Sequence, residues 1–476
     1  MLTQKFLSSV AACRLAYSLA AFNVVACSSA PPKSPDIHYA QEYSAGPTSA
    51  SAVEQQDGAL EQQWWRAFSS AQLNELIALA EQQSPDLLIS AERVRQAELQ
   101  LRIANASWFP SLSATASSGE SRSKVQGQGS VRSESSRLGL GVNYEVDLWG
   151  GLAANRTAAR AGFEATRYDQ DAAALSIKAA IASGWFQWLS LNERIATVEK
   201  NIAIAERVQG IVEARYRNGV ATAAEVAQQK TNLLTQRASR LPLQSQLHQT
   251  QTALAILLGK TPQEFLLPSE SLLTIAVPQI APGTPAQLVS RRPDLAAAEA
   301  DLMAAQANIH AARAALLPGF TLSANASESA SQLFALNPAT QSSGWSLSLA
   351  QTLFNGGRLV NQKRLSEARR DELVLQYHKA ILVALQEVDN ALVAAETSYR
   401  QELSQDEILV NAQRSLKLTE ARYRSGSSDL LSLLEAQRSL FQAQDSLVQQ
   451  RLARLTAAVD VYKALGGGWQ LTQEAQ

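Results

Sequence analysis

Two long stretches of the chain carry apolar residues at helical spacing, and each is interrupted by a tight break. In the stretch 358–465, apolar positions recur at steps of four and three on both sides of a break at 420–426. A spacing that averages 3.5 residues predicts helices that pack side by side and supercoil left-handed. A helix over 358–424 would be roughly 100 Å long at about 1.5 Å per residue. The apolar positions are Ile381, Leu385, Val388, Leu392, Ala395, Tyr399, Val448, Leu452, Leu455, Val459 and Tyr462.

The break occurs twice, which indicates an internal duplication. The segment EARYRNG at 213–219 recurs as EARYRSG at 420–426, 207 positions later. Further paired landmarks keep their order and spacing to within a residue or two: 84–87 with 292–295, 109–110 with 317–318, 149–151 with 355–357, and 258–259 with 465–466. Such self-similarity predicts two structurally similar halves rather than several unrelated domains. The first half repeats the helical seam, with Ile177, Ile181, Gly184, Trp188, Leu191, Ile195 and Val198.

Between the helices of each half, the apolar period changes to two. From position 137, apolar residues at 138, 140, 142, 144 and 146 alternate with glycine and polar residues at 139, 141, 143, 145 and 147. This pattern predicts a strand of about ten residues with one apolar and one polar face. The segment 111–121 is its weaker partner, and Phe320–Ala326 and Trp345–Leu349 repeat the pattern in the second half. We therefore expect one antiparallel hairpin per half.

Four such strands fit a membrane sheet but cannot close one. A membrane β-strand needs roughly 9 to 11 residues, and small closed barrels begin at about eight strands. An open edge in lipid would leave backbone groups unsatisfied. Three copies giving twelve strands is the simplest solution, and a soluble four-stranded sheet packed on the helices is the alternative. The predicted fold class is mainly α with a small β part: duplicated long helical hairpins form a trimeric α-barrel, and four strands per protomer complete a 12-stranded membrane β-barrel.

The helices around each hairpin have complementary lengths. The helix before a hairpin and the returning helix together match the outgoing helix, so they could stack end to end into a second rod. We expect a first repeat at 63–260, with a hairpin at about 111–147 and a tip at 216–222. A linker or equatorial segment at 261–284 follows. The second repeat at 285–466 has a hairpin at about 319–354 and a tip at 423–429, and a C-terminal tail occupies 467–476.

The first 26 residues have the features of a lipoprotein signal peptide. Lys5 and Arg14 supply positive charge, and residues 15–26 are mostly apolar. The run VVAC ending at Cys27 resembles a lipobox, in which the chain is cut before the cysteine and the thiol and new amino group are acylated. Cys13 fits the pattern more loosely, and cleavage without lipid is the other reading. Serines rather than aspartate follow Cys27, which favours the outer membrane, and 27–62 is expected to be a lipidated extended segment.

Composition excludes several kinds of function. The formal net charge is -1 over 476 residues, so no basic surface for nucleic acid is expected. Cys13 and Cys27 are the two cysteines, which leaves the rest of the chain without a thiolate metal site or internal disulfide. The four histidines lie far apart, and no P-loop, GxSxG or HExxH motif is present. We expect no enzyme activity and no cofactor apart from the covalent lipid on Cys27.

Several motifs together resemble the TolC-like outer-membrane efflux factors, and most closely their NodT-type lipoprotein members. The matching runs are WW at 64–65, RRPD at 291–294, ALLP at 315–318, LFNGG at 353–357, Y-x-x-G at 423–426 and LEAQRSL at 434–440. The resemblance covers essentially all of the chain beyond the signal peptide. It implies a homotrimeric duct in the outer-membrane lipid, with a long periplasmic extension. It also implies two partners, a periplasmic adaptor protein and an inner-membrane pump, mostly of the resistance-nodulation-division type.

The same resemblance suggests roles for particular residues. Tyr216, Gly219, Tyr423 and Gly426 match the hairpin tips that meet the adaptor. Glu435 matches an acidic position that rings the periplasmic constriction, while Ser432 stands where some relatives have a second acidic residue. We hypothesise that Glu435 and Asp429, with Arg438 or Arg422 as partners, hold the closed state; a solvated pair of Glu435 and Arg438 is the alternative. Gly150, Gly151, Gly356 and Gly357 are the predicted strand-to-helix turns.

The predicted function is a passive channel of a tripartite efflux system that exports small molecules such as drugs and toxic compounds. Two alternatives stay open. One is the outlet of a type I protein secretion system. The other is a structural periplasmic coiled-coil lipoprotein without a pore, against which the two-faced strands argue. The sequence does not identify the exported substrate.

Overall fold

A computed structural model of the chain describes residues 62–124, 129–280 and 284–470. The predicted signal peptide, Cys27 and nearly all of the segment 27–62 lie outside these residues, as do the last six positions. The chain separates into units 1–38 and 39–476, and the description concerns the second unit.

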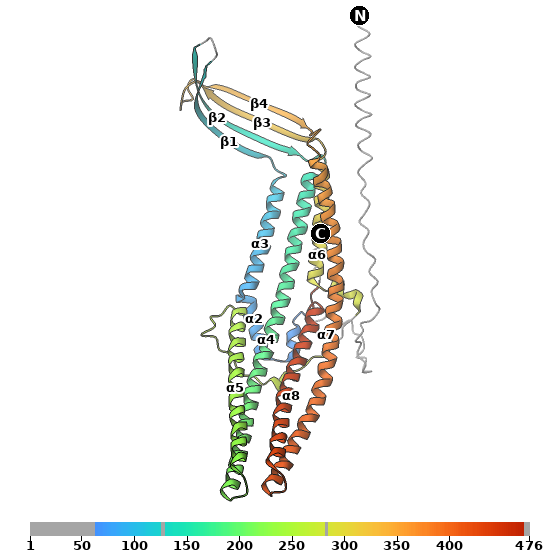
Figure 1. Cartoon of the computed structure of the whole chain (residues 1–476). Coiled ribbons are helices and arrows are strands. Elements are labelled where there is room, and N and C mark those ends of the chain that lie inside the picture. Colours follow the sequence, from blue (N-terminus) through green and yellow to red (C-terminus); the bar gives the residue numbers. More distant parts are fainter. Residues whose placement is uncertain (1–61, 125–128, 281–283, 471–476) are drawn as a thin grey trace. The chain divides into compact units, whose positions relative to one another are not determined.

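Seven α-helices make up most of the described residues (Figure 1). In the first half they are α2 (Ala71–Gln83), α3 (Pro85–Ala106), α4 (Gly151–Arg217) and α5 (Ala223–Leu257). The second half contains α6 (Pro293–Ala314), α7 (Arg358–Arg424) and α8 (Leu430–Ala464). Short 3-10 helices lie at Trp64–Phe68 (η1), Leu272–Thr274 (η2) and Pro285–Ser290 (η3). The halves match in length, with 22 residues in α3 and α6, 67 in α4 and α7, and 35 in α5 and α8.

The helices pack in a fixed lateral order. Helix α4 packs against α3 and α5 on one side and against α6 and α8 on the other. Helix α7 in turn packs against α6 and α8 (Figure 1). Helices α3 and α5 therefore form one edge of the helical layer, and α7 forms the opposite edge.

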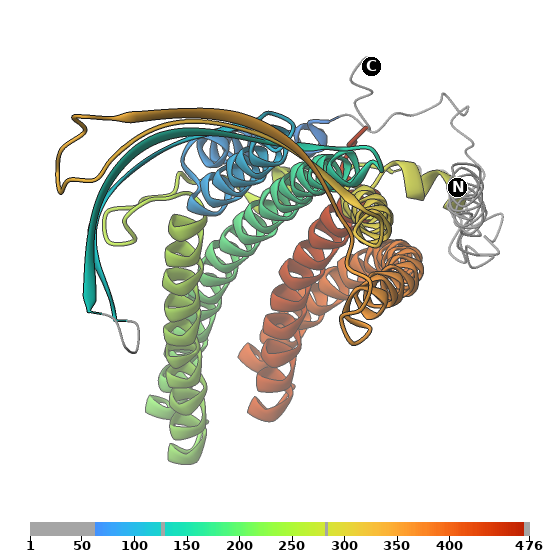
Figure 2. The same ribbon diagram turned by 90° about the horizontal axis from the view of Figure 1, so that it is seen from above.

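The strands form one antiparallel sheet in the order β1-β2-β3-β4. They are β1 (Ser111–Lys124), β2 (Ser130–Val146), β3 (Gly319–Ala330) and β4 (Thr340–Ala350), and they run together as one curved ribbon (Figure 2). Each half supplies one hairpin, as predicted. Strand β2 begins at Ser130, earlier than the alternating pattern indicated. The pattern missed this start because 130–136 is serine-rich and charged, although its backbone pairs with β1. The predicted fold class, mainly α with a small sheet and duplicated long helical hairpins, is confirmed.

Glycines allow the shorter helices to meet end to end. Gly259, after α5, lies against the backbone of Gln83, the last residue of α2 just before α3, and Gly466, after α8, lies against the backbone of Arg291 before α6. Both adopt positive φ, +67° and +86°. A Cβ at either position would collide with the facing carbonyl, so only glycine permits this approach. Stacked in this way, α5 continues into α3 and α8 into α6, as the helix lengths suggested.

Replacing Gly466 with alanine is expected to destabilise the protein by about 3 kcal/mol, because strain at positive φ adds to the collision with Arg291. Gly210→Ala is the matched control, since this glycine lies inside α4 with open space where a Cβ would stand. That control should be neutral or slightly stabilising. Denaturant unfolding of the two variants measures the difference. Equal stabilities would contradict end-to-end packing through Gly466.

One buried apolar cluster lies near these helix junctions. Trp64 of η1 stacks on Tyr462 of α8 with ring centroids 5.3 Å apart, and Phe68 contacts Phe186 of α4 at 5.1 Å. Gly184 lets Leu254 of α5 approach α4 closely. The predicted seam of α4 is buried at Ile181, Trp188, Leu191 and Val198. In α7 the prediction was partly wrong, because Tyr399 is exposed and small residues such as Ala384 and Ala391 line the seam instead.

Candidate functional site

The sheet carries its apolar side chains on one face. Pairing aligns Leu140 with Ala114 of β1 and with Ala326 of β3, and it aligns Leu322 with Leu347 of β4. These side chains have no covering layer within the chain: Leu140 is 55% exposed and Trp345 is 78% exposed. An exposed apolar surface that is continuous over four strands is typical of contact with lipid or with another protein.

The opposite face of the same sheet is polar. Serine, threonine, asparagine and glycine alternate along all four strands here, and neighbouring side chains bond to one another or to the sheet backbone. Ser323 Oγ lies 3.1 Å from Asn143 Oδ1, and Ser327 Oγ lies 2.9 Å from Ser342 Oγ. Glycines at 139, 141 and 344 lie on this face and project no side chain from it. A polar, hydrogen-bonding face suits contact with water.

Both edges of the sheet are open. Within the described residues β1 pairs with β2 alone, and β4 pairs with β3 alone. An edge strand presents a row of unpaired N–H and C=O groups, which makes it a template for another strand. An edge in contact with lipid would leave those groups unsatisfied.

Aromatic and apolar side chains are also exposed where the helices meet the sheet. They are Trp108, Phe109, Leu148, Trp149, Leu353 and Phe354. The indole of Trp149 donates a hydrogen bond to the carbonyl of Pro318 at 2.7 Å, which joins the two halves at this level. Tryptophan and other aromatic residues are enriched at membrane–water interfaces.

The predicted strand-to-helix turns lie at this junction. Gly150 directly precedes α4 with φ +73°, and Gly357 directly precedes α7 with φ +81°. Gly356 is also at positive φ, whereas Gly151 is the first residue of α4 and lies against Ala314. These turns reverse the chain from the sheet into the long helices.

At the other end of the long helices, α4 turns into α5 and α7 turns into α8. Gly219 and Gly426 occupy matching positions in these turns, with φ +76° and +79°. Thr222 and Glu225 form a capping box at the start of α5. At the start of α8, the Asp429 carboxylate accepts a hydrogen bond from the Ser432 backbone N–H at 2.7 Å. This bond holds the pKa of Asp429 below its usual value.

The two tip tyrosines have different environments although their motifs match. Tyr423 is 1% exposed, and the Arg215 guanidinium lies over its ring at 4.7 Å. Arg215 Nη1 also donates to the Tyr423 carbonyl at 2.6 Å. Burial, followed by the charge of Glu225, raises the pKa of Tyr423 while Arg215 opposes the shift. Tyr216, in contrast, is 49% exposed.

The predicted gate residues lie along the first turns of α8 and at the end of α7. Glu435 and Arg438 form an ion pair on the exposed surface of α8. Asp429 and Ser432 are exposed and are joined by the hydrogen bond of the helix cap. The sequence carries a signal for this cap, because an aspartate directly precedes an apolar helical run. The side chain of Arg422 is exposed on α7. Within one copy, these five residues form two local contacts rather than one cluster.

Replacing Asp429 with alanine is expected to loosen the first turn of α8 at neutral pH. The folded pKa of Asp429 is lowered, so its contribution is fully present above the unfolded value and is lost as the pH falls below about 4. Asp429→Asn should keep the cap without this pH dependence, because asparagine caps helices well. Amide hydrogen exchange at Ser432 across this pH range measures the difference. Unchanged exchange in Asp429→Ala would contradict the cap.

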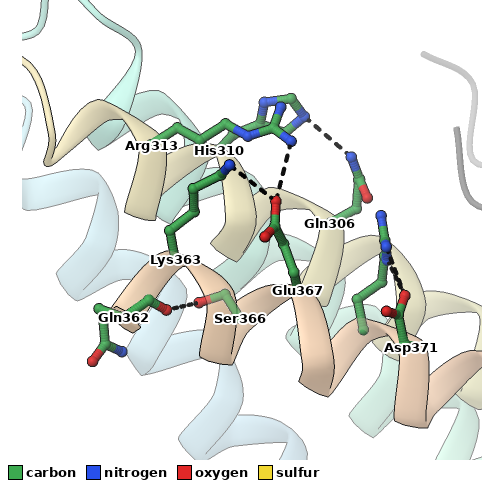
Figure 3. A network of polar contacts seen from close by, with 9 residues as sticks. Gln306, His310, Arg313, Gln362, Lys363, Ser366, Glu367 and Asp371 are labelled. Carbon is green, nitrogen blue, oxygen red and sulfur yellow. Dashed lines mark hydrogen bonds and ion pairs between the residues drawn. The ribbon is translucent and has the colours of Figure 1, made fainter. Parts of the chain in front are cut away.

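A cleft of about 690 Å³ lies between α4, α6 and α7, and its lining includes Asn155, Asp301 and Arg369. Burial, followed by the charge of Asp169, raises the pKa of Asp301. Beside this cleft, Arg313 of α6 and Lys363 of α7 both reach Glu367, at 3.7 Å and 3.2 Å (Figure 3). These contacts join α6 to α7 without forming a nucleophile–base pair.

Neither a cluster of metal-binding side chains nor a membrane-spanning helix is present in the described part of the chain. No group of three or more histidine, cysteine, aspartate or glutamate residues could hold a metal ion there. Of the helices that the structure describes, none combines the length and apolar character needed to span a membrane.

The chain is similar in sequence, and in one case in fold, to known outer-membrane proteins. The family model of the outer membrane efflux proteins matches residues 76–260 and 284–467. The pyoverdine export outer membrane protein OpmQ of Pseudomonas putida is 37% identical over 421 residues, covering 86% of this chain and 89% of OpmQ. The toluene efflux pump outer membrane protein TtgC of the same species is 31% identical, covering 96% and 95%. The open-state structure of the Neisseria gonorrhoeae outer membrane channel MtrE superimposes with a TM-score of 0.80 at 25% identity, covering 94% and 100%.

A two-faced sheet with open edges, joined by glycine turns to paired long helical hairpins, defines a class of outer-membrane channel subunits. The chain belongs to the outer membrane efflux protein family. The resemblance inferred from the sequence motifs is thereby confirmed, and the chain is the outer-membrane component of an efflux system.

Proposed function

We propose that three copies of the chain form one passive duct that exports small molecules. The single observation that carries this proposal is the sheet, which has an apolar face, a polar face and two open edges. Pairing β4 of one copy with β1 of the next would satisfy both edges and place the polar face around a water-filled lumen. Three copies supply twelve strands, within the range of membrane barrels, and the matched long helices would continue the tube into the periplasm. In this proposal the pump drives export, because the duct has no energy source.

The lipid anchor and the partners form a finer part of the proposal. Cys27 would be acylated and would tether the chain to the outer membrane, in agreement with the lipobox. The relatives named above serve pyoverdine export and toluene efflux, which supports small molecules as the exported class. The tips at Tyr216–Gly219 and Tyr423–Gly426 would meet a periplasmic adaptor, and the pump would be of the resistance-nodulation-division type. Glu435 of three copies would ring the constriction, where like charges repel and cations bind.

Oligomeric state and export together test the proposal. The purified protein in detergent should have the mass of three copies and should run as a trimer in gels until it is heated. Cells lacking the gene should retain a toxic pump substrate, and the intact gene should restore export. A trimer that restores secretion of a protein but not efflux would favour a type I outlet. A folded monomer would support the non-pore scaffold instead.

A further inference from the structure

The first helical hairpin (α4 and α5) contacts the second (α7 and α8) through polar pairs along its length. At the tip, Arg215 covers the ring of Tyr423, and Arg207 Nη2 lies 2.9 Å from Glu420 Oε2. Further along, Asn232 Nδ2 donates to Gln437 Oε1 at 2.9 Å, and Arg194 Nε donates to Asp445 Oδ1 at 2.6 Å. We name this contact the inner seam, because it joins the two halves of one copy.

The internal duplication repeats the tip pairs of the inner seam. With the constant offset of 207 residues between the hairpins, Arg422 corresponds to Arg215 and Tyr216 corresponds to Tyr423. Arg414 and Glu213 correspond in the same way to Arg207 and Glu420. All four counterpart side chains are exposed within one copy. They lie on α7 and at the end of α4, so they cannot repeat the inner-seam contact within the same chain.

A ring of three copies would bring these counterparts together. In such a ring, which rests on the proposed function, α7 of one copy would meet α3 and α5 of the next as α4 meets α6 and α8 inside one copy. Exposed apolar residues mark both edges, including Leu375, Leu403 and Val410 on α7 and Leu99, Ile103 and Leu234 on α3 and α5. We name this contact the outer seam. Its occupant is therefore a second copy of the chain.

The outer seam cannot repeat every contact of the inner seam. The counterparts of Arg194 and Asp445 are Gln401 and Ala238, which cannot form an ion pair. The counterparts of Asn232 and Gln437 are Ser439 and Lys230. The outer seam thus loses the ion pair further along the helices and keeps the two arginine pairs at the tip.

We propose that the outer seam is closed at its tip by Arg422 over Tyr216 of the partner subunit and by Arg414 paired with Glu213 of the partner subunit. Because the inner seam has the additional ion pair, the duct opens along the outer seam. This proposal gives Arg422 a partner other than Glu435 or Asp429, and it accounts for the different exposures of the two tip tyrosines.

Cysteine cross-linking tests the geometry. The double variant Tyr216→Cys with Arg422→Cys, treated with a short bifunctional thiol reagent, should give covalent dimers and trimers. Arg215→Cys with Tyr423→Cys is the matched control and should give an internal link at the mass of one copy. Each single variant should remain unlinked, which excludes a contribution from Cys27. If the Tyr216→Cys, Arg422→Cys variant had the mass of a trimer but formed no cross-link between copies, this inference alone would be overturned. If no trimer formed, the proposed function would be overturned as well.

Conductance in planar bilayers tests the role in closure. Arg422→Ala should raise the single-channel conductance at least threefold, while Arg194→Ala should leave the tip closed. Arg414→Glu should also open the channel, and adding Glu213→Arg should close it again. Equal conductance of the Arg422→Ala and Arg194→Ala forms would contradict opening along the outer seam, as would failure of the charge swap to restore closure.

Discussion

Arginine in place of Leu140 is expected to prevent stable assembly of the sheet in a bilayer. Leu140 lies on the apolar face of β2 between Ala114 and Ala326. A charged side chain near the middle of a lipid-facing strand costs about 2 to 4 kcal/mol. Unfolding in urea with the protein inserted in lipid vesicles measures this loss. We expect Leu140→Arg to have both a lower unfolding free energy and a smaller inserted fraction.

Asn325→Arg is the matched control for this substitution. Asn325 lies on the polar face of β3, opposite Gly141 and Gly344, so there is room for a longer side chain in contact with water. This variant should assemble normally, and its added positive charge should shift the ion selectivity of the pore toward anions. If Asn325→Arg lost stability and Leu140→Arg did not, the two faces would have been assigned the wrong way round.

Arg292→Ala is expected to lower the free energy of unfolding by about 3 kcal/mol. Its guanidinium is buried and bonds to Asp294 through Nε and Nη2, at 3.0 Å and 2.7 Å. Nη1 donates to Glu387 of α7 at 2.7 Å and to the carbonyl of Ala464 at the end of α8. Removing one partner of a buried network leaves the others uncompensated, which costs about 3 to 5 kcal/mol when all are buried. The lower part of that range applies, since Asp294 and Glu387 remain half exposed to water.

The neighbouring arginine provides the control. Arg291 is only partly buried, so Arg291→Ala should change the unfolding free energy by less than about 1 kcal/mol. Chemical denaturation of both variants under identical conditions compares them. Equal losses would show that Arg292 does not join α6, α7 and α8 as the geometry indicates. A larger loss in Arg292→Ala than in Arg291→Ala would also explain why the RRPD run stands at the start of α6.

Much of this architecture could be predicted from local sequence signals. The recurring EARYR-x-G runs predicted two helical hairpins, since glycine at positive φ is required at each tip. The alternation from Leu138 to Val146 predicted the two faces of β2, because side chains on a strand alternate. The start of β2 at Ser130 was missed because strand pairing there depends on the partner backbone, and its side chains carry no apolar period.

The contacts between the two helical hairpins could not be predicted in the same way. Arg194 and Asp445 are separated by 251 positions, and only the lateral order of the helices brings them together. The identical motifs gave no sign that Tyr423 is buried while Tyr216 is exposed, since the difference depends on which hairpin lies beside each one. The gate interpretation came from the resemblance to the efflux factors, and it did not use the sequence signal for the helix cap that Asp429 forms.

Single-channel conductance of the purified protein in planar bilayers tests whether the chain forms a trimeric duct. We expect insertion with a small, mostly closed conductance, which should rise in Glu435→Ala if Glu435 rings the constriction. Equal conductance in both forms would keep the duct and remove Glu435 from the gate. A folded, trimeric sample that inserts but passes no ions would contradict the duct itself.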